Sequence, residues 1–317
     1  MEIIREGSAL RFALNLPLTP QQLRDAEDWI AGLSASCPPP NPEILTRHDS
    51  PTFKSWSQNV TLALKTFRSG PLRKVVLARS SSFELDGPLP PFAMAGHLAD
   101  ALPGCFGFCF CPAMRAPAFL GASPERLFKL EGRVLQSEAI AGTRRRSLDP
   151  TEDVRLGEQL MATEKERHEH ALVAEALAAG FARLCVDCDS GHEPELVKLS
   201  RVQHLRTPFS GMLKDGVHAD VVLRTLHPTP ATCGAPADSA RQFIAGVETF
   251  DRGWYAGPIG WMEAGRAEFA VAIRSLLARG KRMQVFAGAG IVQGSDAERE
   301  WAELDDKIAA TLHAISP

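Results

Sequence analysis

Apolar residues recur along this chain with two different periods, which predict helices and strands. Between Phe53 and Phe67 they return at every third or fourth position, which predicts an amphipathic helix. Further helices are predicted over residues 164–184, 237–244 and 297–315. Strands are predicted where apolar and β-branched residues run between turn residues, over residues 74–85, 117–123, 197–200, 202–213, 257–265, 267–280 and 281–292, with a hairpin over 125–142 that turns at Glu131 and Gly132.

The order of these elements indicates the fold class. Strands outnumber helices and mostly follow one another directly, which is typical of antiparallel sheets, so we predict an α+β fold. The prolines of the stretch SCPPPNPE, residues 36–43, exclude helix and predict an extended linker. We expect a short N-terminal segment with this linker over residues 1–50, followed by a single large domain over residues 51–317.

Composition and charge exclude several classes of protein. The chain of 317 residues is 44% hydrophobic, which predicts a large core and excludes intrinsic disorder. Its net charge of −3 argues against nucleic acid or an anionic membrane as the main partner. The first residues lack the features of a signal peptide, and no apolar run approaches the roughly 20 residues of a membrane helix. We therefore expect a soluble, cytoplasmic protein.

The seven cysteines do not form a recognisable framework. Cys105, Cys109 and Cys111 lie in the apolar stretch PGCFGFCFCP, which predicts a buried strand. Cys185 and Cys188 make one CxxC motif without the second ligand pair that a zinc site needs. A zinc or redox site stays open as an alternative, but the pattern favours reduced, mostly buried thiols.

The first long predicted helix carries two carboxylates on its apolar face. At about 100° per residue, Glu166 and Glu169 lie on the stripe formed by Val173 and Leu177. Buried carboxylates need cations nearby. A capping box from Thr163 to Glu166 would explain the first glutamate locally, but it leaves Glu169, one turn deeper, unexplained.

The last predicted helix repeats this pattern. Ser295 is a good N-cap residue, and Glu300, Glu303 and Lys307 follow on one narrow face. A solvated face with an ordinary Glu303–Lys307 pair is the alternative. Two Glu-x-x-Glu pairs suggest a hard divalent cation, because Mg²⁺ prefers a few carboxylates together with waters and substrate oxygens.

Four single residues are weaker candidates by themselves. Lys74 opens an apolar strand, where burial would favour a neutral amine, although such a lysine commonly reaches to water. Glu125 is either an acid with a raised pKa or a hairpin charge. His204 is either catalytic or a satisfied core histidine, and its spacing favours the latter. Arg274 lies in an apolar run and needs an anion. The glycine-rich stretch over residues 287–295 could offer backbone N–H groups to an anion.

Taken in order, these residues resemble the chorismate-utilising enzymes, and specifically the isochorismate synthases. The resemblance spans about Lys74 to Lys307, nearly three quarters of the chain, with segments in family order and at family-like spacing. It implies one large α+β domain in which two mostly antiparallel sheets pack together with helices outside. The matching segments are KVVLARS, GASPERLF, AIAGTRRR, TEKERHEHALV, VQHLRTPFSG, LHPTPATCGAP, FDRGWYAGPIGW, FAVAIRS and FAGAGIVQGSDAEREWAELDDK.

The resemblance implies chorismate as the small-molecule substrate and Mg²⁺ as the cofactor. Lys74 matches the general base that activates water for attack at C2, and Glu125 matches the general acid for the departing C4 hydroxyl. Lys74 also separates this chain from the ammonia-using anthranilate synthases, which commonly carry glutamine there. Glu169 and Glu303 match direct metal ligands, whereas Glu166 and Glu300 resemble groups that act mainly through water.

The remaining matches would hold the substrate. Arg274, Tyr255 and Lys307 match groups that bind the carboxylates, and Gly288 and Gly290 match an anion-binding turn. Gly142, Thr143, Thr232 and His204 match positions that line the substrate ring and the metal-bound carboxylate. We also place His204 with the catalytic residues.

The chain also departs from the family pattern. Leu304 stands where threonine is frequent, and fewer residues precede Lys74 than is usual. A salicylate synthase, which goes on to expel pyruvate, and a truncated non-catalytic homologue are the alternatives to an isochorismate synthase. The sequence is equally compatible with a product that is used to make a siderophore, salicylate or menaquinone. We expect a monomer whose further partners, if any, are downstream enzymes.

Overall fold

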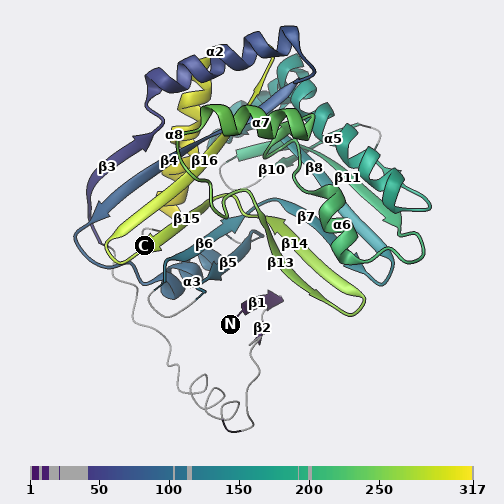
Figure 1. The fold of residues 1–317 in the computed structure, drawn as a ribbon, viewed down its shortest axis with the longest axis horizontal. Coiled ribbons are helices and arrows are strands. Elements are labelled where there is room, and N and C mark those ends of the chain that lie inside the picture. Colours follow the sequence, from purple (N-terminus) through teal and green to yellow (C-terminus); the bar gives the residue numbers. More distant parts are fainter. Residues whose placement is uncertain are drawn as a thin grey trace.

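The computed structural model of this chain describes residues 2–6, 9–13, 21, 42–102, 104–112, 116–191, 193–198 and 202–315. Within these residues, two seven-stranded sheets with antiparallel pairing lie side by side, as Figure 1 shows. In spatial order, sheet I consists of β10 (Glu195–Lys198), β11 (Val202–Met212), β8 (Val134–Arg145), β7 (Arg126–Glu131), β14 (Arg266–Val271) and β13 (Pro258–Glu263), with β9 (Asp189–Ser190) paired to β11. Sheet II consists of β12 (Gly234–Ala235), β4 (Lys74–Leu85), β16 (Arg282–Val292), β15 (Ser275–Arg279), β6 (Ala118–Ser123) and β5 (Phe106–Phe110), with β3 (Ile44–Ser50) paired to β4.

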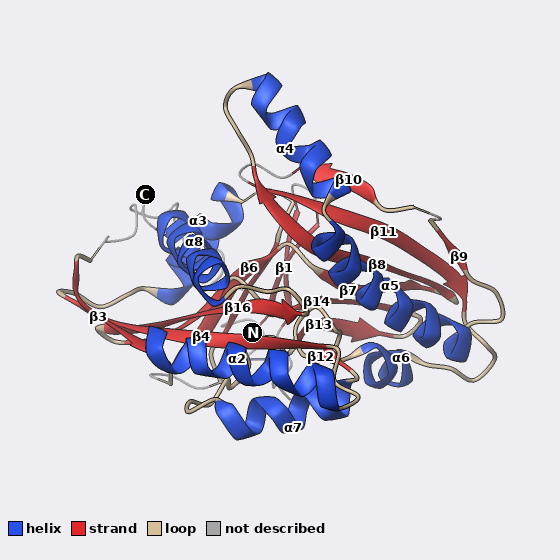
Figure 2. Cartoon of the chain, turned by 90° about the horizontal axis from the view of Figure 1, so that it is seen from above, coloured by secondary structure: helices blue, strands red, loops and turns tan. Residues whose placement is uncertain are grey.

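Helices cover the outer surfaces of the two sheets, as Figure 2 shows from above. The buried core of sheet I includes residues of α5 and α6, and that of sheet II includes residues of α2, α3, α7 and α8. A separate hairpin pairs β1 (Glu2–Glu6) with β2 (Ala9–Ala13). The helices are α2 (Phe53–Ser69), α3 (Pro91–Ala101), α4 (Pro150–Ala162), α5 (Glu164–Leu184), α6 (Ala219–Leu226), α7 (Ala237–Val247) and α8 (Ala297–Ile315).

The alternation of side chains along β4 separates the core from the site. Val75 and Leu77 belong to the core that α2, α7 and α8 share with sheet II. Successive residues of a strand point to opposite faces, so Lys74 and Val76 lie on the other face. That face meets α5, because the Lys74 side chain contacts Glu169 of that helix.

Two short connections carry the chain from one sheet to the other. Residues 124–125 join β6 of sheet II to β7 of sheet I, and residues 272–274 join β14 of sheet I to β15 of sheet II. The connections lie against each other, since Val271 N donates to Glu125 O at 3.0 Å and Ala122 N donates to Arg274 O at 3.2 Å. The single strand predicted over residues 267–280 is therefore wrong: it is two strands in two sheets.

The predicted fold class and most predicted elements are confirmed. Strand β4 and helix α5 have the predicted bounds, and the hairpin turns at Gly132, where φ is +61°. Helices α3, α4 and α6 were not predicted. Strand β3 precedes the domain boundary predicted at residue 51, yet it pairs with β4 as part of sheet II. Residues 36–41 of the predicted linker lie outside the described residues.

The cysteines and the apolar character of the helices can be compared with what the sequence predicts. The six cysteines in the described part of the chain are free thiols, but only Cys185 and Cys233 are buried, so the prediction of mostly buried thiols is not confirmed. Strand β5, however, lies at the end of sheet II and is partly exposed, so the prediction of a buried strand there is wrong. Among the described helices, none combines the length and apolar character needed to cross a membrane.

Candidate active site

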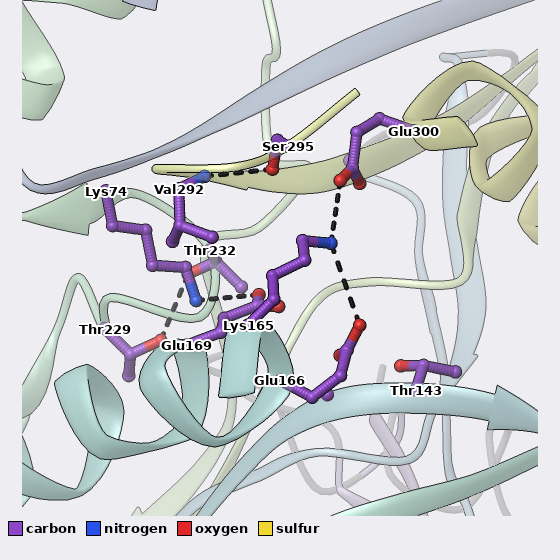
Figure 3. Close-up of polar contacts among 12 residues, drawn as sticks. Lys74, Thr143, Lys165, Glu166, Glu169, Thr229, Thr232, Val292, Ser295 and Glu300 are labelled. Atoms are coloured by element: carbon purple, nitrogen blue, oxygen red, sulfur yellow. Dashed lines mark hydrogen bonds and ion pairs between the residues drawn. The ribbon is translucent and has the colours of Figure 1, made fainter. Parts of the chain in front are cut away.

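Lys74 is the first residue of β4 and lies at the centre of a cluster of charged side chains. The side chain is fully buried, because β4 pairs with β16 on one edge and with β12 on the other. Its Nζ lies 2.9 Å from Oε1 of Glu169 on α5 (Figure 3). Thr232 is also buried, and it lies within 3.3 Å of Thr229, oxygen to oxygen. The first residue of the central strand is thus held against the apolar face of α5.

The two glutamates of α5 point into the site for reasons other than capping. Thr163 Oγ1 donates to the carbonyl of Gln159 at 2.6 Å and makes no cap hydrogen bond to α5, so the capping-box explanation for Glu166 is wrong. Burial, with the charges of Glu169 and Glu303, raises the pKa of Glu166. Both glutamates therefore face the region that α8 also lines.

Helix α8 supplies the second acidic pair. Its N-cap is Asp296, whose side chain accepts from Arg299 N at 3.0 Å, rather than the predicted Ser295. Glu300 is buried, and burial raises its pKa. Burial also acts to raise the pKa of Glu303, but Lys307, at 2.6 Å, holds it below its ordinary value. The alternative of a solvated face is therefore wrong for Glu300, although the Glu303–Lys307 pair that belonged to this alternative is present.

Lys165 connects the two helices, and the sequence analysis did not single it out. Its Nζ donates to Glu300 Oε1 at 2.8 Å and lies 3.7 Å from Glu166 Oε1, as the dashed lines of Figure 3 show. In the sequence this lysine directly precedes Glu166, but nothing there indicates its contact with Glu300. A lysine in the first turn of a helix is usually solvated, which is why its position gave no warning.

Glycines on the facing strands leave room for these carboxylates. A Cβ on Gly290 of β16 would overlap Oε1 of Glu169, and one on Gly142 of β8 would lie 3.2 Å from Oε2 of Glu166. Gly142 also has a φ of +74°, which other residues rarely adopt. Gly288 has a different role: its carbonyl accepts a hydrogen bond from Lys307 Nζ at 2.7 Å.

Glu125 lies on the connection from β6 to β7 and is buried. Its N–H donates to Ser123 Oγ at 3.1 Å, which fixes the turn. Burial raises the pKa of its carboxyl to about 7, with a further contribution from the charge of Glu138, while Lys74 and Lys307 oppose the rise. A carboxylic acid with this pKa is half protonated near neutral pH, as a general acid requires.

Arg274 lies on the return connection between the sheets and has a φ of +52°, a strained conformation for arginine. Its Nη1 donates to the carbonyl of Lys307 at 3.3 Å, and burial lowers its pKa. Tyr255 is also buried, which raises its pKa to about 12, and its ring stacks on Phe286. In the described part of the chain no carboxylate forms an ion pair with Arg274, so the guanidinium can receive an anion.

His204 lies on β11 with its Nδ1 3.1 Å from Thr143 Oγ1 and 3.2 Å from the carbonyl of Gly142. A carbonyl only accepts, so Nδ1 carries the proton and Nε2 is the acceptor. Burial lowers the pKa of His204 to about 4, so the imidazole is neutral at pH 7. The site therefore offers a hydrogen-bonding imidazole rather than a positive charge at this position.

The donor set fits a hard divalent cation. Four carboxylates on two facing helices are the ligands that Mg²⁺ prefers, and glycines 142 and 290 leave room beside two of them. Within the described residues, no three acidic, histidine or cysteine side chains are gathered closely enough to enclose a metal. Instead, each of the four glutamates is next to the Nζ atom of a lysine, supplied by Lys74, Lys165 or Lys307.

Contacts in the structure connect many of the predicted site residues, while their roles in catalysis and metal binding stay predictions. The connected residues are Lys74 with Glu169 and Gly290, Glu166 with Gly142, Thr143 with His204, and Lys307 with Glu303, Gly288 and Arg274. A sequence model described as chorismate binding enzyme matches residues 13–316. The chain therefore belongs to the chorismate-binding enzyme family.

Particular members of this family are similar along most of the chain. The isochorismate synthase MenF of Escherichia coli (strain K12) is 38% identical over 289 residues, which are 90% of this chain and 66% of the relative. The isochorismate synthase DhbC of Bacillus subtilis (strain 168) is 36% identical over 274 residues, covering 84% and 68% of the two chains. Several of the curated relatives are much longer than this chain, which spans about half to two thirds of their length.

Solved structures show the same fold. The menaquinone-specific isochorismate synthase MenF from Escherichia coli superposes with a TM-score of 0.82 at 36% identity, covering 94% of this chain and 69% of that one. Anthranilate synthase component I from Streptococcus pneumoniae TIGR4 gives a TM-score of 0.80 at 25% identity, covering 96% and 68%. The two packed antiparallel sheets are thus shared by an isochorismate synthase and an anthranilate synthase component.

Proposed function

We propose that this chain is an isochorismate synthase, which converts chorismate to isochorismate with Mg²⁺ as cofactor. The observation that carries the proposal is a buried lysine, Lys74, in contact with Glu169, together with a buried carboxyl, Glu125, whose pKa near 7 is influenced by the charges of Lys74 and Lys307. Isochorismate synthases among the relatives support the choice of reaction. The alternative of a non-catalytic homologue gains no support from this complete set of groups.

The proposed reaction adds water at C2 of the ring and removes the hydroxyl from C4. The neutral amine of Lys74 accepts a proton from the attacking water as the new C2–O bond forms. The electrons of the C1=C2 double bond move to form C1=C6, and those of the C5=C6 double bond move to form C4=C5. The C4–O bond breaks, and Glu125 donates its proton so that the leaving group departs as water. Atoms balance, because one water enters and one leaves, and the net change is an isomerisation.

The other residues hold the substrate. Arg274, Tyr255 and Lys307 bind the carboxylates of this dianion, while His204 and Thr143 offer neutral hydrogen bonds to the ring substituents. Glu169 and Glu303 would hold the Mg²⁺ ion directly, with Glu166 and Glu300 acting through water. The ion would neutralise a substrate carboxylate beside the acidic helices.

A product analysis tests the proposal. Purified protein is incubated with chorismate with and without Mg²⁺, products are separated by chromatography, and pyruvate is assayed in parallel. Isochorismate that forms without pyruvate and only with Mg²⁺ supports the proposal. Salicylate with stoichiometric pyruvate identifies a salicylate synthase instead, and the absence of any product favours a non-catalytic homologue.

A matched pair of lysine variants guards against a contaminating enzyme. Lys74→Ala should abolish turnover, whereas Lys281→Ala, on the exposed turn between β15 and β16, should retain it. Circular dichroism would show that both variants are folded. Equal turnover in the two variants contradicts the role of Lys74.

A further inference from the structure

Lys165 is the side chain that joins the acidic pairs of the two helices. Its Nζ contacts Glu166 of its own helix and Glu300 of α8. Lys74 and Lys307 differ in this respect, because within the described residues Lys74 pairs only with Glu169 of α5 and Lys307 only with Glu303 of α8. The contact with Glu300 is a short charge-assisted hydrogen bond of 2.8 Å, and the side chain of Glu300 is only 3% exposed.

This bridge lies where a divalent cation would need carboxylate oxygens. A cation that is bound by carboxylates of both helices must interact with Glu166 and Glu300, either directly or through water. Those two carboxylates already share one ammonium, which is itself only 27% exposed. The ammonium and a divalent cation therefore compete for the same charge.

The charges of the site support this view. Glu169 and Glu303 each have a lysine of their own, Lys74 and Lys307, whereas Glu166 and Glu300 share the single ammonium of Lys165. A divalent ion added beside this ammonium would bring like charges together in a partly buried region, which is costly. Removing the Lys165 charge should therefore leave this pair of carboxylates more anionic and attract the metal.

We propose that Lys165 is an internal counter-ion which holds the two acidic pairs together and which a divalent cation must displace in order to bind. This inference rests on the metal part of the proposed function, because it assumes that the glutamates bind Mg²⁺. It adds a positioning residue that sets how tightly the metal binds. It also predicts that metal binding frees the Lys165 ammonium from Glu300.

Calorimetric titration with Mg²⁺ alone, without substrate, tests the competition. Lys165→Met should bind Mg²⁺ about tenfold more tightly than the unchanged protein, because the competing ammonium is gone. Lys165→Arg keeps a cation that can bridge the same carboxylates and should stay within about threefold of the parent. Damage to the fold would weaken metal binding, so a gain in affinity is a result that a merely structural role does not give.

Arg167→Met is the matched control for net charge. Arg167 is two residues away on α5, is exposed, and contacts only Glu193 among the charged groups described, at 3.5 Å. The Arg167→Met variant removes one positive charge, as Lys165→Met does, but it keeps the bridge from Lys165 to Glu166 and Glu300. Its Mg²⁺ affinity should therefore change by less than about twofold. A gain equal to that of Lys165→Met would show a general charge effect and would overturn the proposal.

Chemical labelling of the unchanged protein gives a second measurement that needs no variant. Acetylation by an amine-reactive reagent, followed by mass spectrometry, should increase at Lys165 when Mg²⁺ is added, with Lys281 as the internal reference. If labelling of Lys165 is unchanged or lower when Mg²⁺ is added, the proposed displacement of its ammonium is wrong.

The outcomes separate the two proposals. If the parent binds Mg²⁺ and Lys165→Met binds it equally or more weakly, this inference is wrong and the proposed function stands. If neither the parent nor any variant binds Mg²⁺, the metal part of the proposed function fails, and this inference fails with it.

Discussion

The carboxylate of Glu169 lies in the space that a side chain on Gly290 would fill. A single Cβ on that glycine would overlap Oε1 of the glutamate, which in turn lies 2.9 Å from Lys74 Nζ. The absence of a side chain on β16 therefore decides where a carboxylate from α5 can lie.

Gly290→Ala should displace Glu169 and so disturb both the ion pair with Lys74 and the proposed metal site. We expect turnover to fall by about 10²-fold, because displacements of about 1 Å in an active site have effects of this size. Gly246→Ala on α7 is the control: nothing lies within 4 Å of its added Cβ, and alanine favours helix, so activity should be kept. Steady-state kinetics of both variants check this, and parental turnover in Gly290→Ala would contradict it.

The buried carboxyl of Glu125 predicts how the reaction depends on pH. A general acid must be protonated, so kcat/KM should fall as pH rises through the Glu125 pKa of about 7, tenfold per pH unit well above it. Glu125→Gln should lose at least about 10²-fold in turnover at pH 7 and should lack this descending limb. Rates measured from pH 6 to pH 9 decide the matter, and a flat parental profile over that range would exclude Glu125 as the acid.

The same carboxyl should make the folded state less stable at high pH. Between its ordinary pKa of 4.5 and the folded value of about 7, the folded chain retains a proton that the unfolded chain has lost. Stability therefore falls as pH rises through this window and changes no further above it. At about 1.4 kcal/mol per pH unit the cost reaches about 3 kcal/mol.

Replacing this glutamate should therefore stabilise the protein, but only at high pH. Relative to the parent, Glu125→Gln should gain about 3 kcal/mol in the free energy of unfolding at pH 8 and almost nothing at pH 4.5. Urea unfolding followed by circular dichroism measures both values. Glu158→Gln, at an exposed position, should show no such difference between the two pH values. An equal effect of Glu125→Gln at both pH values would argue against a buried, protonated carboxyl.

Arg274 should govern the binding of substrate more than the rate of the chemical step. Arg274→Lys keeps the charge but loses the planar fork that binds a carboxylate through two hydrogen bonds. We expect KM to rise by about tenfold or more with a smaller change in kcat. Arg279→Lys, exposed at the end of β15, should leave both constants unchanged. A change confined to kcat would assign Arg274 a different role.

The elements with clear periodicity could be predicted from the sequence, whereas crossings between sheets could not. The run over residues 267–279 contains no glycine or proline, so it gives no turn signal where the chain changes sheet beside Arg274. Capping was also misjudged on both acidic helices. Thr163 bonds to the preceding helix and Asp296 caps α8, since several short polar side chains lie close together at each helix start.

The candidate site was predicted in its composition but not in its electrostatics. Glu169 could be inferred from its position on an apolar face, and the glycines from the resemblance. Lys165 could not, because its partner Glu300 lies 135 residues further along the chain. Contacts of this kind depend on how two helices approach each other, which local sequence does not specify.

The pairing of β16 with β4 along its whole length has a consequence for how the protein is made. Lys74 is opposite Val292, so the central strands of sheet II are contributed by segments more than 200 residues apart. Strand β4 can pair with β16 only after the ribosome has synthesised most of the chain. Native contacts that are so distant in sequence slow folding and leave the strand edge exposed in the meantime. This edge of β4 should therefore depend on protection during synthesis more than the edge between β7 and β8, which pair as neighbours in sequence.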